Sequence, residues 1–391
     1  MTFLNRILEP PTYGFSRDGA LVVPTRQQIL REFFSRCSVF ASKKNWLPFF
    51  GWTVTGALTV AFFVFISGYF SWPLFAAGMV YSMVCLGTHG TIWLHRYCTH
   101  RGYQFSAPIW RTVCRNLVIR IIPEEIYVVS HHVHHQLTEK PGDPYNVHGG
   151  WLYCFLADVN HQLIARNLTE KDYAQLCRLM GHTGVKLNTF EQYQKWGSLA
   201  HPFWSVAHYA ANWAFWYGLF FMMGGHALAT ALFGMSAVWA IGVRTYNFDG
   251  HGRGKDQRRE GVDFNWDDLS INQLWPGYVA SEWHNNHHLY PNGARSGFLP
   301  HQVDLAWLFI CAYRKLGGIQ SVRDYKADFL RDYYHPWLES KRTGIALPHS
   351  LRNPEEESGT SSTKDDAGLM LAEYESQAPA GSQPVPIDHH L

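Results

Sequence analysis

Two uncharged runs that follow one another directly are the strongest constraint on this chain. Residues 47–70 and 71–94 each contain no Asp, Glu, Lys or Arg. About 20 apolar residues cross a bilayer as a helix, so each run is long enough to span a membrane. Two further apolar runs, 202–225 and 226–243, follow after a polar interval. A buried helix of a soluble protein could explain one such run, but the pair in succession predicts a membrane protein with four spanning helices.

The short joints between these runs indicate two helical hairpins. The first joint lies near residues 71–73 and the second near 224–226, and neither contains an acidic or basic side chain other than a histidine. The first 46 residues carry seven Lys and Arg side chains, an excess that membrane proteins keep on the cytoplasmic side. We therefore expect both termini to be cytoplasmic, in a bacterial inner membrane or the endoplasmic reticulum.

The sequence predicts three regions. Residues 1–46 form a cytoplasmic N-terminal segment. Residues 47–340 form the membrane domain, in which 95–201 and 244–340 make a cytoplasmic helical cap. Residues 341–391 are rich in Glu, Ser, Gly and Pro, so they are predicted to be a disordered tail. The predicted fold is therefore an all-α integral membrane protein.

Composition excludes several classes of function. The formal net charge of +2 is too balanced for a general nucleic-acid binder, so we expect no nucleic-acid partner. The seven cysteines are scattered and form no CxxC pair, which argues against a zinc ribbon or a secreted disulfide scaffold.

The 22 histidines, in contrast, are clustered. Two segments, 131–135 and 284–288, share the pattern HxxHH, in which the three histidines lie on one face of a helix. A third pair, His95 and His100, follows the second apolar run. Residues five apart point about 140° away from each other on an ideal α-helix. Two metal ions, or a helix end between the two residues, would allow both to act as ligands.

Eight imidazoles in three clusters are too many for one metal ion and fit two. Neutral imidazole binds iron, copper, nickel and zinc. The sequence contains neither HExxH nor Glu-x-x-His, which argues against a zinc protease and a carboxylate-rich ferritin-like centre.

The order of the three boxes, HRxxxH, HxxHH and HNxHH, resembles the membrane fatty acid desaturases, and most of all their acyl-CoA (Δ9, stearoyl-type) and bacterial branch. The likeness covers about residues 47–290. It implies two iron ions in the cap. The nine histidine ligands that it implies are His95, His100, His131, His134, His135, His251, His284, His287 and His288. His251 comes from an NxxxH motif, and Asn247 in that motif would be a weaker or water-mediated tenth ligand.

The chain also departs from the family pattern. His132 occupies a position that is commonly Arg, and Tyr145 replaces a His in a family Asp-Pro-His-Asn segment. We expect His132, Asp249 and Glu282 to support the ligands, with Asp143, Asp263 and Asp267 as further candidates. No HPGG haem signature occurs, so electrons would come from a separate cytochrome b5-like or ferredoxin-like donor.

The resemblance implies O₂-dependent insertion of a double bond into a long fatty acyl chain. The acyl carrier is left open between coenzyme A, an acyl carrier protein and a membrane lipid. An apolar tunnel would hold the chain, with Gly78 and Met79 near its closed end and His89 along it. The alternatives are a hydroxylase or an alkene-forming decarboxylase on the same scaffold. A metal transporter is the alternative from another class, but it would need ligands near the bilayer midplane.

Overall fold

The computed structural model describes residues 3–160, 163–264 and 282–345, and they are mostly helical. The apolar part contains α2 (Trp46–Gly68), a continuous helix made of α3 (Trp72–Val80), η3 (Tyr81–Leu86), α4 (Gly87–His89) and η4 (Gly90–Thr99), and α11 (Pro202–Gly250). Within these described ranges, two helices are long and apolar enough to cross a membrane, Lys43–Gly68 and Pro202–Gly250.

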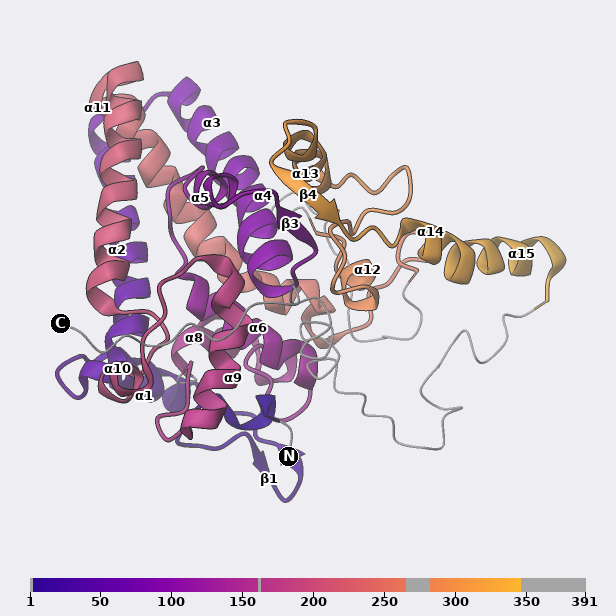
Figure 1. The fold of residues 1–391 in the computed structure, drawn as a ribbon, viewed down its shortest axis with the longest axis horizontal. Coiled ribbons are helices and arrows are strands. Elements are labelled where there is room, and N and C mark those ends of the chain that lie inside the picture. The colour runs from indigo at the N-terminus through magenta and orange to yellow at the C-terminus, as the bar shows by residue number, and fades with distance from the viewer. Residues whose placement is uncertain (1–2, 161–162, 265–281, 346–391) are drawn as a thin grey trace, which may run out of the picture.

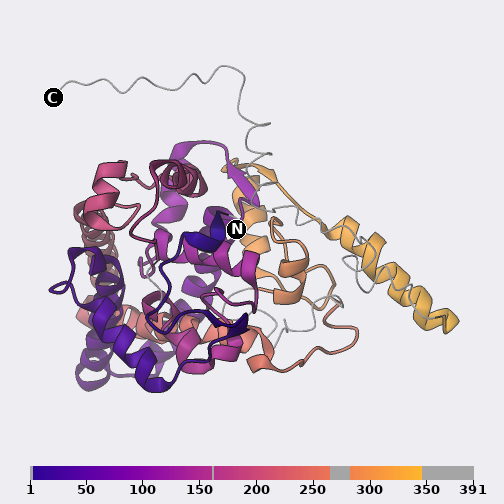
Figure 2. The ribbon, with the colours of Figure 1, turned by 90° about the horizontal axis from the view of Figure 1, so that it is seen from below.

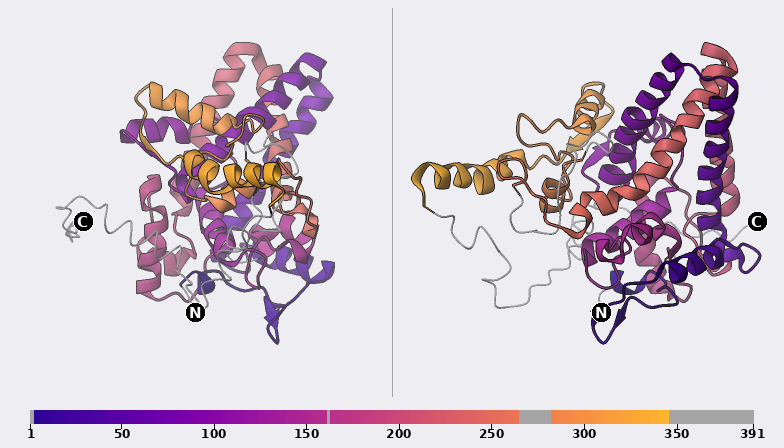
Figure 3. Two further views of the ribbon diagram at one scale, coloured as in Figure 1. Left: turned by 90° about the vertical axis from the view of Figure 1, so that its right-hand side faces the viewer. Right: turned by 180° about the vertical axis from the view of Figure 1, so that it is seen from behind.

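The long helix α11 is broken into two arms at Gly224 and Gly225. Gly225 has a φ of 64°, a left-handed conformation that glycine adopts without a steric penalty. The two arms lie beside α2 and α3, so the apolar helices form two hairpins that pack together (Figures 1 and 3). The breaks occur where the sequence predicts them.

Glycines allow these apolar helices to approach closely. A Cβ on Gly234 would lie 2.7 Å from the Cα of Phe62 in α2, and one on Gly78 would lie 2.4 Å from the Cγ of Met235. Small residues at such crossings are the usual means by which helices associate within a membrane.

The remaining elements form a second part of the molecule around the ends of these helices. Before α11 they are η1 (Leu4–Arg6), α1 (Arg26–Cys37), η2 (Lys43–Asn45), α5 (Pro108–Arg115), α6 (Glu124–Leu137), η5 (Val147–Gly149), α7 (Trp151–Phe155), α8 (Ala157–Asn160), α9 (Glu170–Met180), η6 (Gly181–Thr183) and α10 (Phe190–Trp196). After α11 they are η7 (Gly252–Gly254), α12 (His284–Leu289), α13 (Leu305–Lys315), α14 (Lys326–Phe329), η8 (Leu330–Tyr334) and α15 (His335–Thr343).

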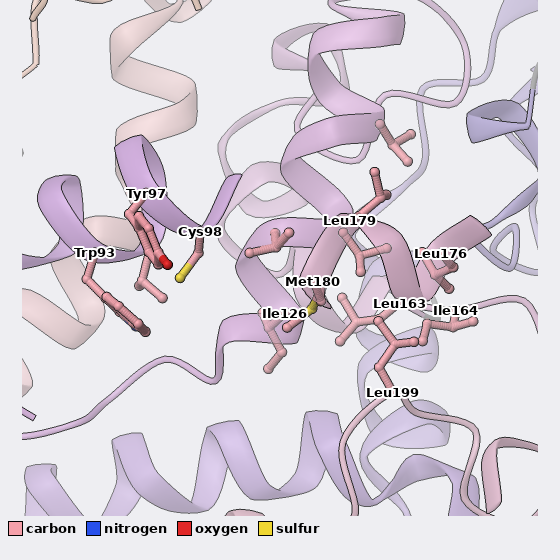
Figure 4. Packing of buried hydrophobic residues seen from close by; sticks show 14 of the residues in the cluster. Trp93, Tyr97, Cys98, Ile126, Leu163, Ile164, Leu176, Leu179, Met180 and Leu199 are labelled. Carbon is pink, nitrogen blue, oxygen red and sulfur yellow. The ribbon is translucent and has the colours of Figure 1, made fainter. Parts of the chain in front are cut away.

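A shared apolar core joins this part to the end of the second apolar helix. Tyr97 and Cys98 on η4, Ile126 on α6 and Met180 on α9 all belong to one buried cluster (Figure 4). Because η4 and α6 carry the first two histidine boxes, this core fixes the positions of those boxes relative to each other.

Two small antiparallel ribbons accompany the helices. β1 (Ser16–Arg17) pairs with β2 (Ala20–Leu21), and β3 (Tyr103–Phe105) pairs with β4 (Ile319–Val322). The second ribbon is important for the site, because β3 begins three residues after His100. It therefore ties the first histidine box to the segment that follows the third.

The last described helices, α14, η8 and α15, project from the body as an arm (Figures 2 and 3). The arm ends at Thr343, so the first three residues of the predicted tail are helical. Residues 346–391, which make up most of the predicted tail, lie outside the described residues.

Candidate metal centre

All nine histidines predicted as ligands converge in two groups. The five-histidine group consists of His95, His100, His131, His135 and His287, and the four-histidine group consists of His134, His251, His284 and His288. Within each group, one nitrogen from every ring lies within 4.8 Å of the others. The structure therefore places two sites side by side, each of which could hold a metal ion.

The first box reaches one group because η4 is a π-helix. Its hydrogen bonds join residues five apart, and His100 N donates to His95 O at 3.1 Å. His100 directly follows the helix, and the centroids of the two rings are 4.9 Å apart. The local change in helical register therefore removes the separation of 140° expected for an α-helix.

Each HxxHH box contributes to both groups. On α6, His131 and His135 belong to the five-histidine group, whereas His134 belongs to the four-histidine group. On α12, His287 belongs to the first group, and His284 and His288 belong to the second. The spacing predicts that the three histidines of each box share one face of a helix, and this face lies across the boundary between two sites.

Several ring nitrogens that face the centre of the two groups lie close together or have no hydrogen-bond partner. Nε2 of His287 lies 3.0 Å from Nε2 of His95 and 3.1 Å from Nε2 of His135. In the described part of the chain, both nitrogens of His100 and Nε2 of His134 and His288 are buried without a hydrogen-bond partner. Buried polar atoms are nearly always paired, and coordination to a metal would satisfy these lone pairs. The donor set therefore fits two metal ions.

Six of the rings are also held in the neutral form that binds metals. Burial lowers the pKa of these rings well below the usual value for histidine, and the neighbouring imidazoles lower it further. These six rings are His100, His131, His135, His284, His287 and His288. A neutral imidazole keeps one lone pair available for a metal ion.

Carboxylates hold several rings from the outside. Glu282 Oε2 lies 3.1 Å from His95 Nδ1, and Asp143 Oδ1 lies 2.9 Å from His134 Nδ1. Such contacts place the proton on the outer nitrogen and direct the inner nitrogen toward the metal. The sequence predicts this role for Glu282 and offers Asp143 as a further candidate.

Glu139 is a supporting residue that sequence reasoning missed. Its Oε1 lies 3.3 Å from Nδ1 of His251, and its backbone N–H donates to Asp143 at 2.8 Å. Its φ of 58° is uncommon for a residue other than glycine. The only signal in the sequence is its place between the second box and Asp143.

Other predicted residues lie farther from the rings. His132 is buried, and its ring centroid is 6.4 Å from that of His100, but it belongs to neither group. Asp249 pairs with Arg253 at 2.9 Å and is partly exposed. Asp263 accepts a hydrogen bond from the backbone of Arg259, and Asp267 lies outside the described residues.

An apolar cavity lies between α2, α6, α7 and α11, and its lining includes a tyrosine that contacts the five-histidine group. Tyr127 and Tyr145 line it, and the Tyr127 ring stacks on His131 with the centroids 5.1 Å apart. Asn247, the predicted tenth ligand, lines the same cavity. We call this space the central cavity.

A second cavity shares Ile121 and Ile122 with the first and extends toward the second apolar helix. His89, one of the predicted tunnel residues, lines it, and its Nε2 lies 2.8 Å from the carbonyl oxygen of Cys114. Gly78 packs against Met235, and Met79 lies in a small apolar cluster with that residue.

Both cavities border a non-helical segment, residues 116–123, that sequence reasoning also missed. Side chains of α11 satisfy its backbone: Asn212 accepts from Arg120 N at 2.9 Å, and Trp216 donates to Asn116 O at 3.0 Å. Irregular backbone among apolar helices is tolerated where protein groups satisfy it or where it lines a cavity.

Comparison with known proteins assigns the family. The model of a family described as fatty acid desaturase matches residues 70–302, which is more than half of the chain. The chain belongs to the fatty acid desaturase family. The desaturase is 26% identical over 271 residues to the sn-1 stearoyl-lipid 9-desaturase of Anabaena variabilis, covering 67% of this chain and 89% of that protein.

Two plant relatives show a similar degree of likeness. The Delta-9 desaturase-like 1 protein of Arabidopsis thaliana is 23% identical over 65% of this chain and 78% of its own length. The icosanoyl-CoA 5-desaturase of Limnanthes douglasii is 24% identical over 65% of this chain and 67% of its own length. The protein is therefore an oxidoreductase of the desaturase type.

Proposed function

We propose that this desaturase uses O₂ and two external electrons to introduce a double bond into a long fatty acyl chain. The observation that carries the proposal is the convergence of nine imidazoles in two groups beside an apolar cavity. Two iron ions would be held by these groups, and when bound they would supply O₂ activation and the removal of two hydrogens from an unactivated chain.

The residues of the chain would position the substrate. The central cavity would hold the acyl chain, and Tyr127 and Tyr145 would place it beside the two groups. The second cavity continues past Ile121 and Ile122 to His89, so it would hold the rest of the chain. Fixing a flexible chain in one orientation is the main contribution that a protein makes to such a reaction.

We further propose that the four apolar helical segments cross the membrane, with the cap and both termini in the cytoplasm. The ligands support this arrangement, because they come from the end of η4, from α6, from the residue after α11 and from α12. Metal transport would instead need ligands near the middle of the apolar helices. A separate cytochrome b5-like or ferredoxin-like protein would supply the electrons.

The proposed activity is tested by expression in a host that lacks desaturation, followed by mass spectrometry of its fatty acids and hydrocarbons. We expect new double bonds in long acyl chains. Hydroxylated chains or terminal alkenes would show that the same scaffold performs hydroxylation or decarboxylation. An unchanged pool from a correctly folded protein with two iron ions would contradict the proposal.

The same assay tests the closed end of the tunnel. We expect Met79→Ala to lengthen the acyl chains that are accepted, since it would remove bulk beyond the second cavity. A chain-length profile identical to that of the unchanged protein would show that Met79 does not close the tunnel.

A further inference from the structure

A third cavity lies where α11 begins. It shares Arg115, Arg120 and Glu124 with the second cavity, so the two spaces have part of one wall in common. Its other polar and aromatic lining residues are Glu125, Lys186, His201, Trp204, Ser205, His208 and Tyr209. Among the described residues, none of the nine predicted metal ligands lines it. We call this space the interfacial cavity.

The interfacial cavity carries a surplus of positive charge. Three cations and two carboxylates line it, which gives the described lining a formal charge of +1. Glu124 accepts from Nε of Arg115 at 2.7 Å and from Nη2 of Arg120 at 2.6 Å, so two guanidinium groups share one carboxylate. Burial raises the pKa of Glu125 to about 7, which weakens its negative charge near neutral pH. The cavity is therefore suited to an anion.

Two polar atoms of the lining are unsatisfied. Oη of Tyr209 and Nδ1 of His201 are buried, and neither has a hydrogen-bond partner in the described part of the chain. Tyr209 is 4% exposed, and the guanidinium of Arg120 lies 4.7 Å from the centroid of its ring. A hydroxyl group and an imidazole nitrogen can both donate to an anion. Buried polar groups are nearly always paired, so these two atoms indicate a ligand that presents acceptors.

The beginning of α11 adds backbone donors to the same place. His201 is the N-cap residue, and its side chain makes no capping hydrogen bond. The helix starts at Pro202, and its first arm continues to the break at Gly224. The first N–H groups of a helix have no partner within the helix and carry a partial positive charge, so they favour a phosphate group.

Apolar side chains beside the cavity indicate where this phosphate would come from. Phe203, Trp204 and Val206, in the first two turns of α11, are exposed. Trp204 also lines the cavity, and Nζ of Lys186 lies 5.2 Å from the centroid of its ring. Because α11 is long and apolar enough to cross a membrane, a tryptophan at its end would lie at the interface, near the phosphates of the lipids. The exposed apolar side chains would then contact the acyl tails.

We propose that the interfacial cavity binds the phosphate of an anionic phospholipid, which acts as a stabilising ligand and not as a substrate. Basic pockets between membrane helices on the cytoplasmic side recognise head groups of this kind. The inference rests on the proposed crossing of the membrane by α11 and not on the proposed reaction. Because Arg115 and Arg120 also line the second cavity, the bound lipid would stabilise the wall of that cavity.

Binding is tested on the purified protein in a neutral detergent. Dioleoyl-phosphatidylglycerol and dioleoyl-phosphatidylcholine are added separately, and native mass spectrometry and the change in Tm measure their binding. We expect the anionic lipid to bind at least about tenfold more tightly and to raise Tm. Equal binding of the two lipids would overturn the proposal, and so would displacement of the anionic lipid by inorganic phosphate or by stearoyl-CoA. Neither readout depends on double-bond formation, so failure here would leave the proposed desaturation untouched.

Two variants test the residues of the cavity. Lys186→Gln removes an exposed cation, and we expect the affinity for phosphatidylglycerol to fall about fivefold. Tyr209→Phe removes only the unsatisfied hydroxyl, and we expect a fall of about threefold. Lys195→Gln is the matched control for charge, because Nζ of Lys195 lies 5.4 Å from the ring centroid of another tryptophan, Trp196, and Lys195 does not line the cavity. Tyr69→Phe, at an exposed position, is the control for the hydroxyl. Unchanged affinity in both cavity variants would overturn the proposal.

Discussion

The two histidine groups are built by different means. In the five-histidine group, the rings contact one another, with Nε2 of His287 within 3.1 Å of two neighbours, and a π-helical turn brings His95 and His100 together. In the four-histidine group, Asp143 and Glu139 hold His134 and His251 through a loop that follows the second box. The five-histidine group therefore combines a π-helical register with one outer carboxylate, Glu282, whereas two carboxylates from one loop hold the four-histidine group.

This difference has consequences for how each group would fail. A site that depends on crowded imidazoles is sensitive to the loss of a ring. A site that depends on outer carboxylates is also sensitive to changes that leave every ring in place. Because α6 and α12 supply both groups, the loss of a ring from one site also disturbs the helix that carries ligands of the other.

The largest effect is expected when a ring is removed from either group. His287→Ala and His134→Ala should each reduce desaturation by at least about 100-fold. This loss is larger than the loss typical of residues that only contact a metal ligand. Product analysis in the desaturation-deficient host measures this effect. His226→Gln, at the turn of the α11 hairpin, is the control. Full activity in either alanine variant would remove that ring from the proposed site.

Removing the metal should affect the whole cap. The histidines come from η4, α6, α12 and the residue after α11, so metal ions would join segments that are far apart in sequence. Ligands that bind only the folded state stabilise it, so chelation should lower Tm by several degrees, and ferrous iron should restore it. Thermal unfolding with and without chelator measures the change. An identical Tm with and without the chelator would show that no metal ion joins these segments.

Replacing the carboxylates separates the two groups. Glu139→Gln and Asp143→Asn should lower metal affinity about 10- to 100-fold at the four-histidine group alone, because the rings they hold belong to it. Competition with a chelator should then show one metal ion that is bound more weakly and one whose affinity is unchanged. Asp249→Asn, which affects only the pair with Arg253, is the matched control. An equal loss of affinity for both metal ions would show that the loop does not act on the four-histidine group alone.

The smallest effect is expected at Tyr246. Its hydroxyl lies 3.3 Å from Nδ1 of His284, so Tyr246→Phe removes one neutral contact from the four-histidine group. We expect a loss of about threefold in metal affinity, since a net hydrogen bond contributes about 1 kcal/mol or less. The same chelator competition measures it. A loss as large as that of Glu139→Gln would show that hydroxyl and carboxylate contacts are equivalent here.

Spacing made the histidines predictable, because i, i+3 and i+4 positions share a helical face whatever surrounds them. The path of the backbone was not predictable in the same way. The π-helical register at His95 and the sharing of each HxxHH box between two groups depend on tertiary packing. The non-helical segment 116–123 is apolar enough to pass for part of a helix, and its bonds to Asn212 and Trp216 join residues about 100 positions apart.

We propose that nine histidines hold two iron ions in the active desaturase. The most direct measurement is the iron content of purified protein from cells in which new double bonds have formed, determined together with zinc and copper. We expect two iron ions per chain, reduced to one or none by His134→Ala. Active protein with fewer than two iron ions, or with another metal in their place, would contradict it.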